Sequence, residues 1–434
     1  MAGVGGVGRI GRIGAFGVGG GWSPIPGTLP DLDFANNRWF GVSSFASALS
    51  VTRTSPSDYA QKLDGSWQSF AAGVARITDK GILAEESRTN GIRNNSGQGA
   101  GSGGALPTNW ASNLPAGLAL TCSTAGTENG VEYCDITISG TAGASTDGFV
   151  SFEGSQVIAA VISQTWANSF FIKNISGVMP TTYNRIRERD VSGNQLAVLS
   201  STIVLAGSSA NLGQSRQIFV ATTTNASTAF VRPTIEFTFV NATVYNFTFR
   251  IGWPQCELGA SATSPIRTTT VAVTRAADAI SVNSSSSFVT ANASGIYLKI
   301  RPLIVSGGGT RTFVSVVVDG QNRHSAFVGA SDGRFNFTTL TANASQYFLT
   351  STGAMVADTA YKTAARWQAN SAALRVPTAL TSPANNTSNT QPTGTPTIWL
   401  GSLSGSSVFA NGYIERVALF LTPPSDAVLD ALVA

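Results

Sequence analysis

The stretch TIEFTFVNATVYNFTFRIGW, residues 234–253, alternates apolar and polar side chains with a period of two residues over most of its length. Its apolar positions hold Phe, Val, Ile and Tyr, and Thr is its most frequent polar residue. Successive side chains of a strand point to opposite faces of a sheet, and aromatic and β-branched residues favour strands. The stretch therefore predicts strands that bury one face.

Similar runs fill the sequence on both sides of this stretch. Examples are CDITISG at 134–140, SFFIKNIS at 169–176, GIYLKIRPLIV at 295–305 and TFVSVVVDG at 312–320. Many short strands separated by Gly, Ser and Asn turns are typical of sandwiches and jelly rolls. We expect an all-β chain with two antiparallel β-sandwiches in tandem, at 106–270 and 271–434.

The first 30 residues differ from the rest, because ten of the first 21 are glycine and most of the others are apolar. Glycine makes an isolated helix costly here. We expect an arm that orders only when it packs into another subunit of an assembly, and a floppy tail is the alternative. The residues of this expected assembly anchor are Arg9, Ile10, Arg12, Ile13 and Phe16.

Residues 31–105 predict a small β-rich connector. Asp64-Gly65 lies between two short strand patterns and predicts a hairpin. The segment SGQGAGSGGA, residues 96–105, has the composition of a flexible linker. At the other end of the chain, residues 423–434 predict a helix with Ser425 as its N-cap.

The charge pattern argues against nucleic acids and membranes as partners. Only 12% of the residues are charged, the formal net charge is +4, and the arginines are scattered. The densest basic segment, NRIRERD at 184–190, carries its own acids and is interpreted as a solvated face. No run of about 18 apolar residues predicts a membrane span, and the glycine-rich start lacks the compact apolar region of a secretory signal.

Three cysteines are too few for a disulfide framework. Cys122 and Cys134 pair across a ladder under oxidising conditions, or they are two ordinary buried thiols. Cys256 is expected in the core.

The sequence offers few residues for catalysis. A Ser-His-Asp triad requires a histidine, and His324 is the only one. No G-x-S-x-G motif accompanies it, so we expect a turn or strand-edge histidine. No metal-ligand cluster and no phosphate-binding loop is found, so neither a metal nor a cofactor is expected. Glycoside hydrolysis requires two carboxylates across a cleft, and the acids considered for this role are Asp135, Glu153, Asp319 and Asp332.

Two segments resemble parts of tailed-phage virion proteins. ARITDKGILAEESRTN, residues 75–90, resembles a connecting module of phage tail-fibre and structural proteins, and PQCELGASATSPIRTTTVAVTRAAD, residues 254–278, resembles the end of their carbohydrate-binding-module-like jelly roll. The first match is carried by Arg76, Gly81, Leu83, Glu86, Arg88, Thr89 and Asn90. The second is carried by Gln255, Glu257, Ala262, Thr263, Ser264, Thr274, Arg275 and Asp278.

The C-terminal third resembles a concanavalin A-like, laminin-G-type sandwich. The resemblance is carried by residues 360–376 and by the ending with Gly412, Tyr413, Ile414 and Glu415. This family often binds sugars and sometimes calcium. The sequence has no compact acidic loop, so calcium is not expected.

These resemblances imply a non-enzymatic virion protein of a tailed phage, of the tail-fibre or receptor-binding type. Its arm at 1–30 would contact other virion proteins, its sandwiches would contact host surface polysaccharide, and the family suggests a homotrimer. A capsid-decorating or head-fibre protein and a polysaccharide-degrading tail spike are the alternatives. Sugars stack on exposed aromatic rings, and core packing is the other role open to each candidate. The candidate rings are Trp110, Trp166, Tyr183, Trp367 and Trp399. Trp253 is expected to be structural.

Overall fold

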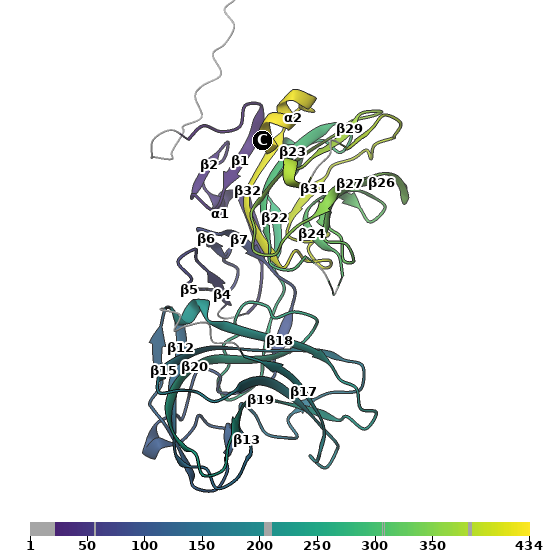
Figure 1. Cartoon of the computed structure of the whole chain (residues 1–434). Coiled ribbons are helices and arrows are strands. Elements are labelled where there is room, and N and C mark those ends of the chain that lie inside the picture. The colour runs from purple at the N-terminus through teal and green to yellow at the C-terminus, as the bar shows by residue number, and fades with distance from the viewer. Residues whose placement is uncertain (1–21, 56–57, 204–210, 306, 308, 381–383) are drawn as a thin grey trace, which may run out of the picture.

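The computed structural model describes residues 22–55, 58–203, 211–305, 307, 309–380 and 384–434. Figure 1 shows two β-lobes joined by a narrow middle part, and every named strand pair is antiparallel. The two α-helices are short, α1 (Phe45–Ala48) and α2 (Asp426–Val433). In the part of the chain described, no helix is both long enough and apolar enough to cross a membrane.

The lower lobe in Figure 1 is a jelly roll of two six-stranded sheets. One sheet has the order β10-β12-β20-β15-β18 with β11 beside β12; its strands are β10 (Leu118–Cys122), β11 (Gly126–Glu128), β12 (Val131–Thr141), β15 (Thr165–Ser176), β18 (Arg216–Thr222) and β20 (Val244–Leu258). The other has the order β17-β16-β19-β13-β9 with β14 beside β19; its strands are β9 (Ala111–Asn113), β13 (Thr146–Ser151), β14 (Ile158–Ala159), β16 (Thr182–Arg189), β17 (Gln195–Thr202) and β19 (Phe230–Phe239).

The phenylalanines of residues 234–253 fill the space between these two sheets. Phe237 and Phe239 of β19 and Phe247 and Phe249 of β20 are at most 1% exposed. Their ring centroids lie 5.2–6.2 Å apart in four contacts among them. The period of two in the sequence therefore places every second side chain in the core, and the prediction of strands in this stretch is confirmed.

The upper lobe is a second sandwich of a nine-stranded and a seven-stranded sheet. The nine-stranded sheet runs β2-β1-β32-β23-β28-β29-β30 with β6 and β7 at its side; its strands are β1 (Thr28–Asp33), β2 (Arg38–Phe40), β6 (Ile77–Thr78), β7 (Gly81–Ala84), β23 (Ser294–Pro302), β28 (Tyr361–Trp367), β29 (Ala372–Arg375), β30 (Ala384–Asn386) and β32 (Gly412–Phe420). The seven-stranded sheet runs β27-β26-β25-β24-β31-β22-β3; its strands are β3 (Leu49–Thr52), β22 (Ala279–Val282), β24 (Arg311–Asp319), β25 (Asn322–Val328), β26 (Arg334–Thr341), β27 (Ala344–Ala354) and β31 (Thr397–Leu400).

The second sandwich contains strands from both ends of the chain. β1 pairs with β32, β3 pairs with β22, and β7 pairs with β32. Much of the expected connector at 31–105 is therefore hydrogen-bonded into the sandwich that was expected to begin at 271. The jelly roll is inserted into the sandwich, because the chain leaves it after β7 and returns to it at β22.

Two chain segments cross between the lobes, and they pair with each other. β8 (Arg88–Asn90) leads into the jelly roll and β21 (Val273–Arg275) leads out of it, in a two-stranded antiparallel sheet. Beside them lies a separate hairpin of β4 (Asp58–Gln61) and β5 (Trp67–Phe70). This hairpin turns at Asp64-Gly65, as the sequence predicts.

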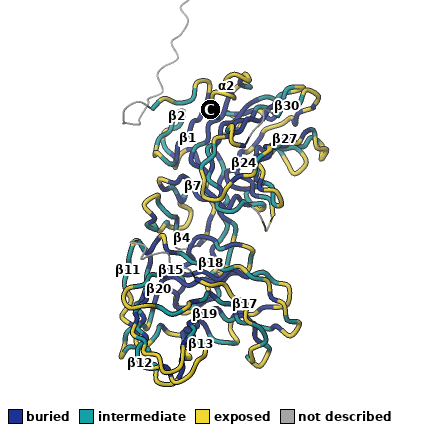
Figure 2. Tube along the Cα trace, viewed as in Figure 1, coloured by how far each residue is buried: buried dark blue, intermediate teal, exposed yellow. Residues whose placement is uncertain are grey.

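Two other local expectations have clear outcomes. Ser425 accepts a hydrogen bond from the Val428 N–H at the start of α2, so the predicted helix and its N-cap are confirmed. Residues 96–105, expected to be a flexible linker, form a hydrogen-bonded loop in which Ala100 N–H bonds to Gly97 and Thr108 N–H bonds to Gln98. Figure 2 shows that the buried residues follow the interior of each lobe and continue through the middle part between them.

Candidate functional site

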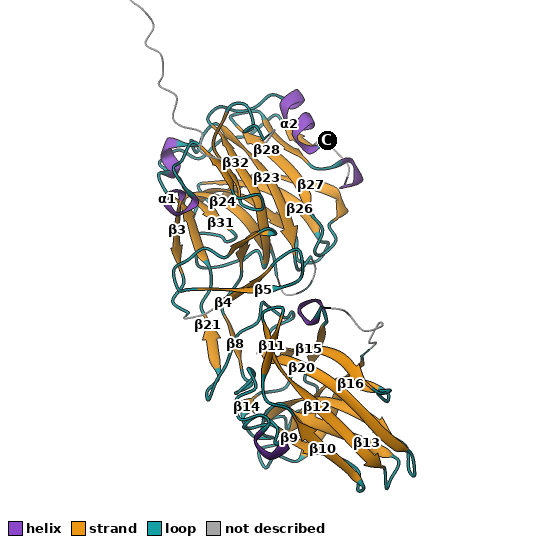
Figure 3. Cartoon of the chain, turned by 90° about the vertical axis from the view of Figure 1, so that its left-hand side faces the viewer, coloured by secondary structure: helices purple, strands orange, loops and turns teal. Residues whose placement is uncertain are grey.

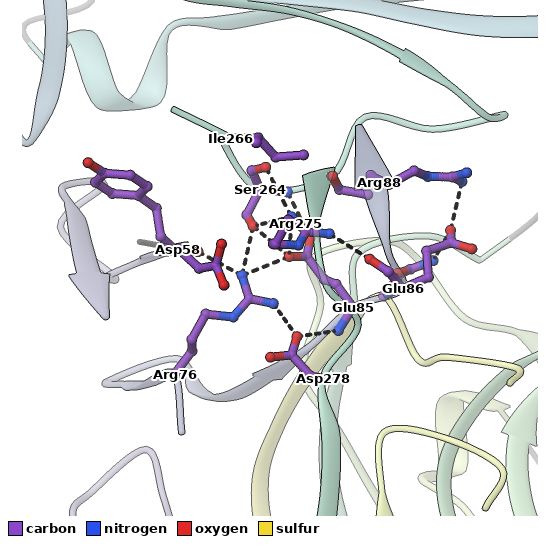
Figure 4. Close-up of polar contacts among 12 residues, drawn as sticks. Asp58, Arg76, Glu85, Glu86, Arg88, Ser264, Ile266, Arg275 and Asp278 are labelled. Carbon is purple, nitrogen blue, oxygen red and sulfur yellow. Dashed lines mark hydrogen bonds and ion pairs between the residues drawn. The ribbon is translucent and has the colours of Figure 1, made fainter. Parts of the chain in front are cut away.

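The two segments that resemble phage proteins meet between the lobes in one buried cluster of charges, which we call the junction. The junction consists of Arg53, Asp58, Arg76, Glu85, Ser264, Arg275 and Asp278. Each charged side chain among them is 0–1% exposed. Figure 4 shows the guanidinium groups directed at the carboxylates and at Ser264.

The charges of the junction balance, with three arginines facing three carboxylates. Arg76 contacts Glu85 at 2.9 Å and also contacts Asp278, which Arg53 reaches at 3.0 Å. Arg53 also pairs with Asp58, and Arg275 lies 3.1 Å from Glu85. Buried charges are tolerated only when they are paired and hydrogen-bonded, and this cluster meets that condition.

Ser264 is the hydrogen-bonding centre of the junction. Its hydroxyl donates to Glu85 at 2.5 Å and accepts from Arg76 and Arg275, each at 2.8 Å. Burial acts against the charged carboxylate, but Arg275 and Arg76 outweigh it and lower the pKa of Glu85 to about 2. Burial has the larger effect on Asp58, whose pKa is raised. The motif residues Arg76, Ser264, Arg275 and Asp278 thus hold the lobes together.

Asn90, also a motif residue, fastens the crossing strand β8 to the end of β20. Its Nδ2 donates to the carbonyls of Pro254 and Ile266, each at 3.2 Å. Its Oδ1 accepts from the N–H groups of Ile92 and Cys256. All of its hydrogen-bonding capacity is used inside the protein, which is a structural role.

A second charged region lies on the outward side of the jelly-roll sheet β17-β16-β19-β13-β9, and we call it the outer face. It consists of Asp147 and Phe149 on β13, Tyr183, Arg185, Arg187 and Arg189 on β16, and Arg232 and Glu236 on β19. The core residues Ile186, Val231 and Ile235 alternate with these positions and point to the opposite side.

The outer face combines aromatic rings with guanidinium groups. Arg185 lies over the Tyr183 ring at 4.2 Å, and Arg187 lies over the Phe149 ring at 4.6 Å. Glu236 accepts from Arg187 through both of its oxygens at 2.6 Å and from Arg185 at 2.6 Å. Arg185 also pairs with Asp147 at 2.7 Å. A planar aromatic surface edged by fixed donors and acceptors is the chemistry that sugar rings and hydroxyls require.

The segment 184–190 differs from its interpretation as a solvated face that carries its own acids. Glu188 points inward with no exposure and accepts hydrogen bonds from Thr224, Asn225 and Thr228. It therefore does not neutralise the arginines beside it in sequence. The period of two in Tyr183, Arg185, Arg187 and Arg189 was the available signal for this face.

A hollow of about 480 Å³ lies where β8 passes the edge strand β14 of the jelly roll. Its lining includes Trp166, Arg88, Arg93, Ile158 and Leu258. The Trp166 ring is 6% exposed, and its Nε1 has no hydrogen-bond partner among the described residues. Trp166 is thus a wall of this hollow and not an open stacking platform.

The other aromatic candidates lie in different parts of the molecule. Trp110 packs on Phe152 in the jelly-roll core, and Trp367 is fully buried in the second sandwich. Trp399 is half-buried, and its ring packs against Gly405. Tyr183 is half-buried on the outer face. The anchor residues Arg9, Ile10, Arg12, Ile13 and Phe16 lie outside the described residues.

His324 lies in the core and not at a turn or strand edge. It sits within β25, is 1% exposed, and stacks on the Trp367 ring at 4.6 Å. Its Nε2 donates to the Ala291 carbonyl at 2.8 Å, and its Nδ1 lies 2.7 Å from the Thr339 hydroxyl. Burial lowers its pKa to about 4. A neutral buried ring without an acid partner is a packing residue.

The acids considered for hydrolysis have other contacts. Asp135 pairs with Arg250 and Glu153 pairs with Arg93, while Asp319 and Asp332 bond to neighbouring residues of their own turns. Over the described ranges, no three His, Cys, Asp or Glu residues lie close enough together to hold a metal ion.

The three cysteines are buried and free. Cys122 and Cys134 lie on adjacent strands with their thiols in hydrogen-bonding contact, which lowers the pKa of Cys122 and raises that of Cys134. Cys256 is fully buried, and burial raises its pKa. Trp253 is 1% exposed and packs on Tyr59 of the hairpin at 4.5 Å, which is a structural contact between parts of the chain.

No protein-family model and no curated protein sequence matches the chain. Solved structures similar to it include the CBM40 domain of the Ruminococcus gnavus IT-sialidase bound to α2,3-sialyllactose, with 14% identity, a TM-score of 0.29, and coverage of 33% of this chain and 84% of that one. Domains LG4-5 of the mouse laminin α1 chain give 10%, 0.22, 60% and 82%. A tail fibre protein of an E. coli phage gives 7%, 0.21, 73% and 40%. These TM-scores lie far below 0.5, so the argument on function that follows rests on the residues themselves.

Proposed function

We propose that this chain is a non-enzymatic structural protein of a tailed-phage virion, of the tail-fibre or receptor-binding type. It is held in the particle through residues 1–30 and presents its jelly roll to glycans on the host surface. The observation that carries the glycan-binding part is the outer face, where aromatic rings and fixed guanidinium and carboxylate groups lie together on an open sheet.

The chemistry of the outer face suits a sugar better than a protein or a membrane. Tyr183 and Phe149 provide ring surfaces, although arginines cover part of each. Arg185, Asp147 and Glu236 are held by one another, so their remaining donor and acceptor sites keep a fixed geometry. Fixed polar groups lose little entropy when they bind hydroxyl groups, which favours affinity.

The arrangement of the lobes is consistent with this role. β1 begins at Thr28 in the second sandwich, and the outer face belongs to the other lobe. A chain held near its first strand would present the jelly roll away from the point of attachment. The junction would keep that orientation, because its buried ion pairs join both crossings to the second sandwich.

Two alternatives have a definite place in this proposal. A capsid-decorating or head-fibre protein would carry the same outer face but dock on the shell, and cryo-EM of the particle separates the two positions. A polysaccharide-degrading tail spike would release new reducing ends from the bound glycan. We also expect a homotrimer, on the resemblance to phage fibres, which mass photometry of the purified chain measures.

The test is binding of the purified full-length chain to an array of bacterial capsular polysaccharides and lipopolysaccharides. We expect at least one glycan to bind, and Tyr183→Ala to weaken that binding by about tenfold while leaving the melting temperature within about 2 °C. Trp399→Ala, a half-buried aromatic of the other lobe, is the matched control and should bind as the wild type does. Absence of any bound glycan, or equal loss in both variants, would contradict the proposal. Release of reducing ends would favour the tail spike.

A further inference from the structure

One end of the outer face holds more positive than negative charge. Four arginines lie on it with two carboxylates, Asp147 and Glu236, and both carboxylates are paired with Arg185 or Arg187. Every Asp and Glu of the chain is among the described residues, and none forms an ion pair with Arg189 or Arg232. The excess of positive charge therefore lies at the Arg189 and Arg232 end.

The register of the sheet places two of these cations directly opposite each other. Arg187 on β16 pairs with Arg232 on β19. Like charges in directly opposed positions of an antiparallel pair are destabilising. Arg187 is compensated by Glu236, but Arg232 is not.

The Arg232 guanidinium is held in place by uncharged groups. It lies over the Phe149 ring at 5.0 Å, on which Arg187 also lies. Its Nε donates to the Glu153 carbonyl at 3.2 Å, and its Nη2 donates to the Ser151 hydroxyl at 2.7 Å. A fixed cation without a carboxylate partner is ready to receive an anion.

Arg189 adds a second cation of the same kind. It is 9% exposed, its Nη1 donates to the Gly193 carbonyl at 3.3 Å, and its Nε has no partner among the described residues. Asp190 is the acid next to it, and this carboxylate accepts instead from Ser192 and Asn194 of its own turn.

The electrostatics of the site agree with this geometry. Burial, together with Arg189 and Arg187, lowers the pKa of Arg232 to about 10. Burial and Arg187 lower the pKa of Arg189 as well. Both groups remain charged at neutral pH, and an anion between them would relieve the repulsion that lowers these pKa values.

We propose that the glycan bound by the outer face is acidic, and that Arg189 and Arg232 hold its anionic substituent. This inference rests on the proposed glycan-binding function and adds to it the chemical class of the ligand. A sugar carboxylate and a sugar phosphate both provide the planar or forked oxygens that guanidinium groups bind in pairs. The sugar ring would then lie towards Tyr183, because Arg185 and Arg187 separate Tyr183 from Arg189 along β16.

The test uses each glycan that the full-length chain binds on the array, before and after its charge is removed. Carboxyl reduction converts uronic acids into neutral sugars, and hydrofluoric acid removes phosphate groups. We expect the glycan to be acidic and its binding to fall at least tenfold after one of the two treatments, which also identifies the anion. Glycans that are neutral, or that bind equally after both treatments, would overturn this inference and leave the proposed function standing. Absence of any bound glycan would instead remove the proposed function.

Variants provide a second and independent measurement. Arg232→Gln and Arg189→Gln should each weaken binding of the acidic glycan at least tenfold and reduce the dependence of its affinity on salt. Arg323→Gln is the matched control, because Arg323 lies in the other lobe and also forms no ion pair among the described residues. Retention of wild-type affinity and salt dependence in both variants would overturn the inference. The treated glycans test it with the wild-type protein if a variant fails to fold.

Discussion

The junction and the outer face are both built from arginines and carboxylates, but their charges add up differently. The junction has three of each and excludes water from all of them. The outer face has four arginines and two carboxylates. An excess charge inside the junction would be very costly, because no water reaches it. The comparison indicates that balanced charge serves the architecture here, whereas excess charge marks a surface that is prepared for a ligand.

The largest expected effect comes from unbalancing the junction. Asp278→Asn keeps the size of the side chain but leaves a net positive charge among Arg53 and Arg76. We expect unfolding to be easier by about 3–5 kcal/mol, as for other buried pairs that lose one partner. Urea denaturation followed by tryptophan fluorescence measures this change.

Asp426→Asn is the control for that variant. Asp426 also contacts two arginines, Arg366 and Arg375, but its side chain is 50% exposed. The expected cost is below about 1 kcal/mol. Equal destabilisation by the two substitutions would show that burial and balance do not distinguish the junction.

A smaller effect is expected from His324, a group that escapes the need for a partner by staying neutral. Its pKa is about 4 in the folded chain, against 6.5 for an ordinary histidine. Between these pH values the unfolded chain binds a proton that the native protein does not, so stability falls as the pH falls from 6.5 to 4. The loss amounts to about 3 kcal/mol.

This effect is measured as the difference in pH dependence between the wild type and His324→Gln, which should lack that part of the slope. The chain has one histidine, so its ring signal in an NMR spectrum is unambiguous. Titration of that signal near pH 6.5 in the folded protein would contradict the prediction.

The smallest stability effect separates two arginines of the same face. Arg187→Gln removes both hydrogen bonds to the buried Glu236 and should cost about 1.5–3 kcal/mol. Arg232→Gln removes a cation without an ion pair and should cost less than about 1 kcal/mol. Thermal unfolding of both variants at the same pH measures the difference. A larger cost for Arg232→Gln would mean that this arginine is structural and not reserved for a ligand.

The sequence predicted the local structure well because local patterns determine it. The alternation in 234–253, the hairpin at Asp64-Gly65 and the cap at Ser425 each depend on neighbouring residues, and each is present. The entry of β1 and β3 into the second sandwich was not predicted. Their partners β32 and β22 lie more than 200 residues away, and a period of two does not identify a partner.

The site was harder to predict, since alternation tells which side chains share a face but not which face is covered. Trp110, Trp166 and Trp367 satisfied the sequence criterion for sugar stacking, yet all three are at most 8% exposed. The arginines of 184–190 seemed to be neutralised by Glu188, which the strand turns to the opposite side. The motif residues did converge, although sequence alone did not indicate that they would form one ionic cluster.

The insertion of the jelly roll also determines how the molecule carries a mechanical load. Both crossings leave the same lobe, so a pull on the jelly roll by a bound cell would be shared between β8 and β21 instead of passing along a single linker. At the other end, β1 lies between β2 and β32, where a pull along the strand shears a whole row of hydrogen bonds at once. Tension applied between these two ends would thus meet the fold in its strongest direction, and the hairpin of β4 and β5 lies outside the line of force.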